Sequence, residues 1–237
     1  MRMVDYSSDG SKIVTAEGTD GARVWDARAT GKQMKYPKIN ELSILDTPLK
    51  VLEAPSKDRG NVVFWAEFSP DNKYILTAQA NGHVKVWNTA SWEIESDISL
   101  TKDEVRVATF SPDSKSIAIG DIRGGIYLWD VGKKTEIKKI KLEGGSEVAV
   151  MGLVFADEGK FLISSHWSRT SPEVKIWDTQ TWTFQSVKNF RCAAVNSTGK
   201  YLAVGGDGQI NLIDLKSNKT IKVIEIIDTE KNYRAVI

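Results

Sequence analysis

Five apolar runs along this chain of 237 residues end in the pair Trp-Asp or in a near relative of that pair. A second motif lies 18 to 22 residues before each ending. It begins with an aromatic or aliphatic residue, continues as a turn rich in Ser, Asn, Asp and Gly, and ends with Lys. The endings are Trp25-Asp26, Trp87-Asn88, Trp129-Asp130, Trp177-Asp178 and Ile213-Asp214, and the leading residues are Tyr6, Phe68, Phe110, Phe155 and Val195. Two motifs at a nearly constant separation define an internal repeat, which constrains the fold more than any single residue does.

Each repeat encodes four short strands. In the third repeat these are 105–110, 115–120, 125–130 and 135–142, rich in the β-branched and aromatic residues that strands favour. The turn residues Ser, Pro and Asp follow the first strand, and Gly-containing dipeptides follow the second. A four-stranded sheet cannot bury both of its faces alone, and radial stacking of such sheets solves that problem. We therefore predict an all-β fold, a β-propeller of four-stranded antiparallel blades.

The repeat boundaries predict one domain over residues 1–237 with about five blades. The repeats span about 1–61, 62–104, 105–147, 148–189 and 190–231, and residues 232–237 read as the start of a sixth. The first repeat carries an insertion within 27–61, and either 32–36 or 49–53 can serve as its fourth strand; the second choice resembles the other repeats better. Three arrangements stay open: part of a longer propeller, a small ring of about five blades, or an open arc completed by another copy.

On these motifs the chain resembles the WD-repeat β-propeller family over essentially its whole length. The resemblance implies a protein-interaction scaffold, and it implies that the repeated Trp and Asp residues are structural. In such a propeller the Trp is expected to fill the space between neighbouring blades. The family's Gly-His pair is absent from its usual place, and the position six residues before Trp129 holds Arg123 instead of Asp. We therefore expect a degenerate polar network, weakest in the third and fourth blades.

Composition narrows the classes of function. With 32 basic and 31 acidic side chains, the net charge of +1 provides no bulk attraction to nucleic acid or to an anionic membrane. Cys192 is the only cysteine, which excludes an internal disulfide and a cysteine-based metal site. The first residues run directly into a repeat, so we expect no signal peptide, and the sequence contains no run of about 18 apolar residues. We expect a soluble cytoplasmic protein without a cofactor.

Catalytic motifs are missing from the sequence. His83 and His166 are the only histidines, they lie two repeats apart, and no Gly-x-Ser-x-Gly motif accompanies them. Both are interpreted as solvated turn residues. We expect that the chain is not an enzyme and that it holds no metal.

One position recurs with a chemical pattern of its own. Four residues before each leading residue the chain has Arg2, Phe64, Arg106, Met151 and Arg191, with Arg234 in the same place in the sixth, partial repeat. We call this set the rim. Family propellers grip partners near this end of the inner strand, and guanidinium groups bind carboxylate and phosphate through a rigid fork. The rim therefore predicts an anionic or acidic peptide partner. The alternative is that these arginines only pair with Asp or Glu of the next loop.

Further partner contacts are expected beside the rim. Trp65 follows Phe64 and is a candidate aromatic anchor. The long turn 164–173 offers His166, Trp167 and Arg169, because long loops on rigid scaffolds often carry function.

The sequence thus predicts a non-catalytic scaffold that binds a peptide or protein surface on one propeller face. The alternative is the regulatory or substrate-recognition part of a larger enzyme, or a propeller enzyme whose site lies in chain that is not present in this sequence.

Overall fold

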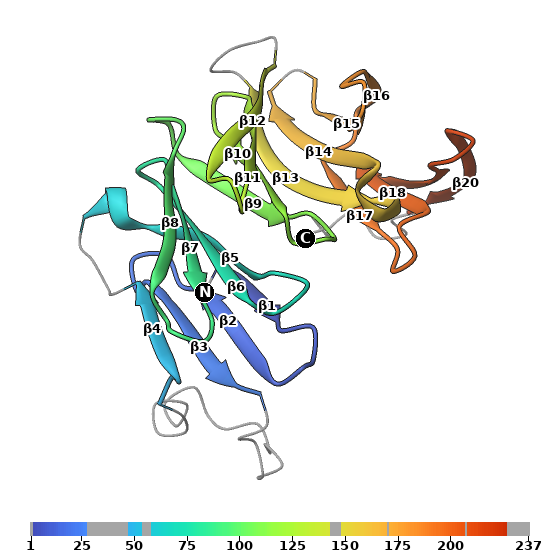
Figure 1. Cartoon of the computed structure of the whole chain (residues 1–237). Coiled ribbons are helices and arrows are strands. Elements are labelled where there is room, and N and C mark those ends of the chain that lie inside the picture. Colours follow the sequence, from blue (N-terminus) through green and yellow to red (C-terminus); the bar gives the residue numbers. More distant parts are fainter. Residues whose placement is uncertain are drawn as a thin grey trace.

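In the computed structural model the described residues are 2–27, 47–53, 58–142, 148–169, 171–206 and 208–226. Within these residues twenty strands form five four-stranded antiparallel sheets. Helix is limited there to the short 3-10 turns η2 (Arg59–Asn61) and η4 (Asp157–Gly159). The sheets follow one another as the blades of an arc (Figure 1). The predicted all-β fold with four-stranded blades is confirmed.

The strands of each blade pair in chain order, which is the meander that tight turns between short strands produce. Blade 1 contains β1 (Met3–Tyr6), β2 (Lys12–Ala16), β3 (Ala22–Asp26) and β4 (Lys50–Glu53). Blade 2 contains β5 (Val63–Phe68), β6 (Tyr74–Gln79), β7 (His83–Asn88) and β8 (Ile94–Ser99). Blade 3 contains β9 (Val105–Phe110), β10 (Ser116–Asp121), β11 (Gly125–Asp130) and β12 (Thr135–Lys141).

Blades 4 and 5 repeat the same scheme. Blade 4 contains β13 (Val148–Ala156), β14 (Phe161–Ser168), β15 (Glu173–Asp178) and β16 (Phe184–Lys188). Blade 5 contains β17 (Cys192–Val195), β18 (Tyr201–Gly206), β19 (Gln209–Asp214) and β20 (Lys219–Glu225). The first strand of each blade lies beside the first strand of the next, so β1, β5, β9, β13 and β17 form the inner row (Figure 1).

The apolar cores lie between the blades. Blade 1 contributes small and β-branched side chains such as Val14 and Val24, and blade 2 contributes the aromatic side chains Phe68 and Trp87. The same pairing of an aliphatic face with a face carrying large side chains recurs at the next three contacts. Each blade therefore has two different faces, and each face needs a neighbour of the other kind.

The indole N–H of the repeated Trp finds a partner in three blades. Its acceptor is a hydroxyl on the adjacent second strand, at a position that holds Thr or Ser. The pairs are Trp25 with Thr15 at 2.9 Å, Trp87 with Thr77 at 3.1 Å and Trp177 with Ser164 at 2.7 Å. In blade 3 this position holds Ile119, and the buried Trp129 Nε1 lacks a hydrogen-bond partner among the described residues.

Blade 3 nevertheless has a polar network that the sequence interpretation missed. The carboxylate of Asp121, which is fully buried, accepts hydrogen bonds from the backbone N–H groups of Arg123 at 2.8 Å and Gly125 at 2.7 Å. It also accepts one from the Tyr127 hydroxyl at 3.0 Å. The stabilising carboxylate thus precedes the expected position by two residues, and the prediction of a weak blade 3 overlooked it.

Two local predictions have different outcomes. The fourth strand of blade 1 is β4, as the resemblance to the other repeats favoured, and the alternative segment 32–36 lies outside the described residues. The prediction of a long turn over 164–173 is wrong at its start, because β14 continues through Ser168. Its residues pair with the unusually long β13, where Val150 lies opposite His166 and the register shifts between Val150 and Gly152.

The Trp–hydroxyl pairs give a testable stability effect. Replacing Thr77 by the isosteric Val leaves the buried Trp87 N–H unpaired, and an unsatisfied buried donor costs about 1–3 kcal/mol. We expect Thr77→Val to lower the free energy of unfolding by this amount in chemical denaturation. The control is Ile119→Val in blade 3, which removes one methylene and no hydrogen bond. An equal loss in both variants would contradict the assignment.

Candidate functional site

Three rim residues are the extra residues of β-bulges in the inner strands. In β5, Val63 pairs with Gln79 and Trp65 with Ala78, so Phe64 has no partner of its own. A bulge bends the strand and re-aims a side chain away from both faces of the sheet. Register shifts at the same place leave Arg106 unpaired in β9 and Met151 unpaired in β13.

Blades 1 and 5 have a related irregularity at this point. The Arg2 N–H donates to the Ala16 carbonyl at 2.7 Å, although Ala16 is the register partner of Met3. The Arg191 N–H likewise donates at 2.9 Å to the carbonyl of Gly205, the register partner of Cys192. The five rim residues therefore occupy one structural position at the start of the inner strands. Arg234 lies outside the described residues.

Three rim residues contact one another across blades 1, 2 and 3. The guanidinium carbon of Arg2 lies 4.8 Å from the centroid of the Phe64 ring, and that of Arg106 lies 4.1 Å from it. The ring is thus within cation–π distance of two arginines. We call Arg2, Phe64 and Arg106 the Arg–Phe–Arg stack.

The two arginines of the stack differ in their ionic partners. Arg106 forms an ion pair with Glu104, which directly precedes the same strand, at 2.7 Å between Nη2 and Oε2. Both side chains are about one third exposed. The alternative interpretation, an arginine that pairs with a loop carboxylate, therefore describes Arg106 in part. Arg2 is exposed and has no ion pair with any residue that the structure describes. A partially neutralised and an unneutralised guanidinium thus flank one ring.

The other two described rim residues lie in β13 and directly before β17. Met151 is 46% exposed at its bulge. Arg191 is exposed on blade 5 and lines a cavity there.

Trp65 has a different environment from the rim. Its indole N–H donates to Glu67 Oε2 at 3.1 Å, and its ring packs against the cores on both sides of blade 3. A partly buried side chain held in this way contributes to packing between blades. Its role as an anchor for a partner stays a prediction.

The three candidates from the long turn differ in their exposure to solvent. His166 lies in β14 and is fully buried, so its interpretation as a solvated turn residue is wrong. Neither ring nitrogen has a hydrogen-bond partner among the described residues, and burial lowers the pKa of His166 to about 4. Trp167 is 45% exposed and Arg169 is exposed, so these two remain available to a partner.

Sequence reasoning missed Glu67, which joins two inner strands. Its Oε1 accepts from the Phe110 N–H at 3.1 Å and from the Thr109 hydroxyl at 2.9 Å. Asp5 does the same one blade earlier, accepting from the Phe68 N–H at 2.9 Å. The signal was an acidic residue directly before the leading aromatic residue in two successive repeats.

Burial raises the pKa of Glu67 to about 7, against the lowering effect of its hydrogen bonds to Phe110, Trp65 and Thr109. Burial also raises the pKa of Asp5. The folded chain therefore binds a proton at Glu67 more tightly than the unfolded chain does. The contribution of this carboxyl to stability falls as pH rises from about 4.5 to about 7.

Glu67→Gln tests this pH dependence. The amide keeps an acceptor for the Phe110 N–H and removes the buried negative charge. We expect the free energy of unfolding to decline less between pH 5 and pH 8 in the variant than in the parent. At pH 8 the variant should therefore be more stable than the parent, by at most about 3 kcal/mol. Thermal or denaturant unfolding at a series of pH values measures it. A parallel pH profile in variant and parent would refute the assignment, and Glu136→Gln on the exposed strand β12 is the control.

Two kinds of feature are missing from the described ranges, a cluster of metal-ligating side chains and a membrane-spanning helix. No group of three or more His, Cys, Asp or Glu side chains there is placed to hold a metal ion. None of the helices in that part of the chain has the length and apolar content of a membrane span.

The comparisons with known proteins concern the repeats and the fold. The family model for the WD domain, G-beta repeat, matches residues 46–88 and 179–214. These segments run from β4 to the end of β7 and from the end of β15 to the end of β19. No curated protein sequence matches significantly.

Among solved structures, a chain in the crystal structure of a mitotic checkpoint complex superposes with a TM-score of 0.75 at 17% sequence identity. The match covers 95% of this chain and 65% of that chain, so this chain spans less than two thirds of its length. At this identity the likeness shows the fold. The chain therefore has the β-propeller fold, and two of its segments match the WD repeat model.

Proposed function

We propose that the chain is a non-catalytic scaffold that binds an acidic peptide segment of a partner protein across the rim positions of blades 1 to 3. The observation that carries the proposal is the Arg–Phe–Arg stack. Propellers with these repeats are typically protein-interaction scaffolds, and the stack supplies a chemical preference for this one.

The geometry of the stack favours an extended acidic segment. The ring of Phe64 limits the positions that the two guanidinium groups can take, so less side-chain freedom is lost when a carboxylate binds. Each guanidinium can present a two-donor fork to a carboxylate. A Glu or Asp side chain on a partner would find Arg2 without competition from described residues, and it would compete with Glu104 for Arg106.

The bulge explains why these side chains are available. Residues on either side of each bulge face the interblade cores; Val63, Val105 and Val107 are fully buried. A bulged residue belongs to neither core, so its identity is not fixed by packing. Three different residue types, Arg, Phe and Met, occupy this one structural position. Such variety favours a role of the position in binding over a role in holding the blades together.

A defined probe tests the proposal. Fluorescence anisotropy is measured with a labelled peptide rich in Glu and with a matched peptide in which Gln replaces each Glu. We expect the Glu peptide to bind at least about tenfold more tightly, and we expect salt to weaken the binding because the guanidinium groups are partly exposed. The double variant Arg2→Gln/Arg106→Gln should lose about tenfold or more in affinity.

The control removes the same charge elsewhere. Lys219→Gln/Lys222→Gln lies on the exposed outer strand β20 and changes net charge equally. If both double variants bind the Glu peptide equally weakly, the loss of affinity comes from the lower net charge and not from the stack, which would contradict the proposal. Equal binding of the Glu and Gln peptides would contradict it as well.

A further inference from the structure

Gly18 lies where the turn between β2 and β3 meets the first strand of blade 2. Its N–H donates to the Val63 carbonyl at 3.1 Å, and its carbonyl accepts from the Val63 N–H at 3.0 Å. Val63 directly precedes Phe64, the aromatic member of the Arg–Phe–Arg stack. The backbone of this turn is therefore fixed to the strand that carries the ring, although turn and strand belong to different blades.

The Arg2 side chain lies against Gly18. A β-carbon added to Gly18 would lie 3.0 Å from Arg2 Nε, 3.7 Å from Arg2 Cδ and 4.0 Å from Arg2 Cζ. The first distance is shorter than ordinary packing allows, so a side chain on this residue would push the arginine aside. Gly18 also has a φ of +69°, in the left-handed region that glycine adopts without strain.

Two neighbours thus hold the Arg2 side chain. The Gly18 backbone lies beside its Nε and Cδ, and the centroid of the Phe64 ring lies 4.8 Å from its guanidinium carbon. The main chain of Arg2 is fixed as well, because its N–H donates to the Ala16 carbonyl at 2.7 Å. None of these contacts neutralises the guanidinium charge.

Arg106, the other arginine of the stack, is held in a different way. Its Nε and Nη2 donate to Glu104 Oε2 at 2.9 Å and 2.7 Å. The contact that fixes this guanidinium therefore also neutralises part of its charge. Arg2 has no ion pair with any residue that the structure describes, so its charge stays available to a partner.

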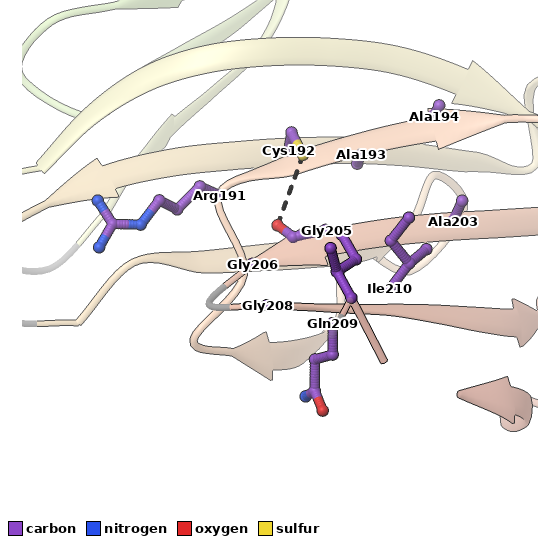
Figure 2. A pocket seen from close by; sticks show the side chains of 11 residues that line it. Arg191, Cys192, Ala193, Ala194, Ala203, Gly205, Gly206, Gly208, Gln209 and Ile210 are labelled. Atoms are coloured by element: carbon purple, nitrogen blue, oxygen red, sulfur yellow. Dashed lines mark hydrogen bonds between the residues drawn. The ribbon is translucent and has the colours of Figure 1, made fainter. Parts of the chain in front are cut away.

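A rim position alone does not place an arginine against the turn of its blade. Arg191 has the same position in blade 5, and its side chain extends away from the strands (Figure 2). β-Carbons added to Gly205 and Gly206 beside it would first meet the Cys192 thiol and the Asn189 backbone. The contact between Arg2 and Gly18 is therefore not a consequence of the repeat.

We propose that Gly18 is a positioning residue of the site for acidic segments. Its missing side chain lets Arg2 lie against both the turn and the Phe64 ring with its charge unneutralised. An arginine held in this way loses less side-chain freedom when it binds a carboxylate, so the affinity is higher. This role of Gly18 rests on the proposed function, since it concerns how one arginine of the stack is made ready to bind.

Gly18→Ala tests this role against a matched control. Gly10→Ala places alanine at a φ of +67° in the same blade, where an added β-carbon would meet nothing within 4 Å beyond the adjoining residues. Both substitutions strain the backbone similarly, and only the first displaces Arg2. We expect Gly18→Ala to bind the labelled Glu peptide about three- to tenfold more weakly than the parent, and Gly10→Ala to bind it like the parent. Equal affinities of the two variants would overturn the proposal.

A double-mutant cycle separates positioning from a purely structural role of the turn. In the Arg2→Gln background the guanidinium is already gone, so Gly18→Ala should change the affinity for the Glu peptide by less than about twofold. A loss as large as in the parent background would show that Gly18 does not act through Arg2. If Gly18→Ala does not fold, Gly18→Asn takes its place with Gly10→Asn as control, because Asn tolerates the left-handed region and still brings a β-carbon.

The position of Arg2 can also be measured without a peptide. The ring current of Phe64 should shift the proton signals of the Arg2 side chain upfield in NMR spectra of the parent, and Phe64→Leu should abolish this shift. We expect Gly18→Ala to reduce the shift and Gly10→Ala to keep it. An unchanged shift in Gly18→Ala would refute the positioning role. A parent that binds the Glu and Gln peptides equally contradicts the proposed function, and the shift still decides whether Gly18 positions Arg2.

Discussion

The contact between the aliphatic face of one blade and the face with large side chains of the next is the interaction on which the rest of the structure depends. A single four-stranded sheet has two apolar faces and can cover neither alone. In the described chain, successive blades cover each other's faces at four contacts. The core between blades 1 and 2, for example, combines Val14 and Val24 with Phe68 and Trp87. Apolar burial of this extent stabilises the arc without a disulfide, since Cys192 is the only cysteine. Because the contact is directional, the arc has two chemically different ends.

The inner strands combine packing with surface chemistry because they are bulged. Before and after each bulge, the strand supplies residues to the cores; Val105 and Val107 are both fully buried around Arg106. The bulged residue itself escapes this constraint. A rigid scaffold can therefore place different side chains at equivalent positions in successive blades without changing its packing. In blades 1 to 3 that freedom produces two guanidinium groups around one aromatic ring.

Much of the fold and part of the site could be predicted from the sequence, because both repeat. Turn chemistry, strand length and the Trp-Asp endings recur, so the five blades followed from the spacing of the repeats, and the rim position followed from the resemblance to the family pattern. Features that depend on a neighbouring blade did not follow. Glu67 is recognised by the N–H of Phe110, which lies 43 residues away in the sequence. His166 is buried because β13 and β14 both extend beyond the usual strand length. The turn residues in the sequence did not indicate that the strands continue this far.

The loss of the fifth Trp illustrates how the blades differ without a loss of fold. Ile213 occupies that position and is 4% exposed, and Phe190 and Leu215 complete the core between blades 4 and 5. The substitution thus lies on the covered face of blade 5, and it does not account for the uncovered one. The other face of blade 5 has the ordinary aliphatic composition of its equivalents in other blades, and it is only partly covered by the described residues. The first blade is likewise ordinary in composition, and its polar groups Thr15, Glu17, Arg23 and Trp25 are paired within the blade, so the repeat accounts for both terminal blades without specialised residues.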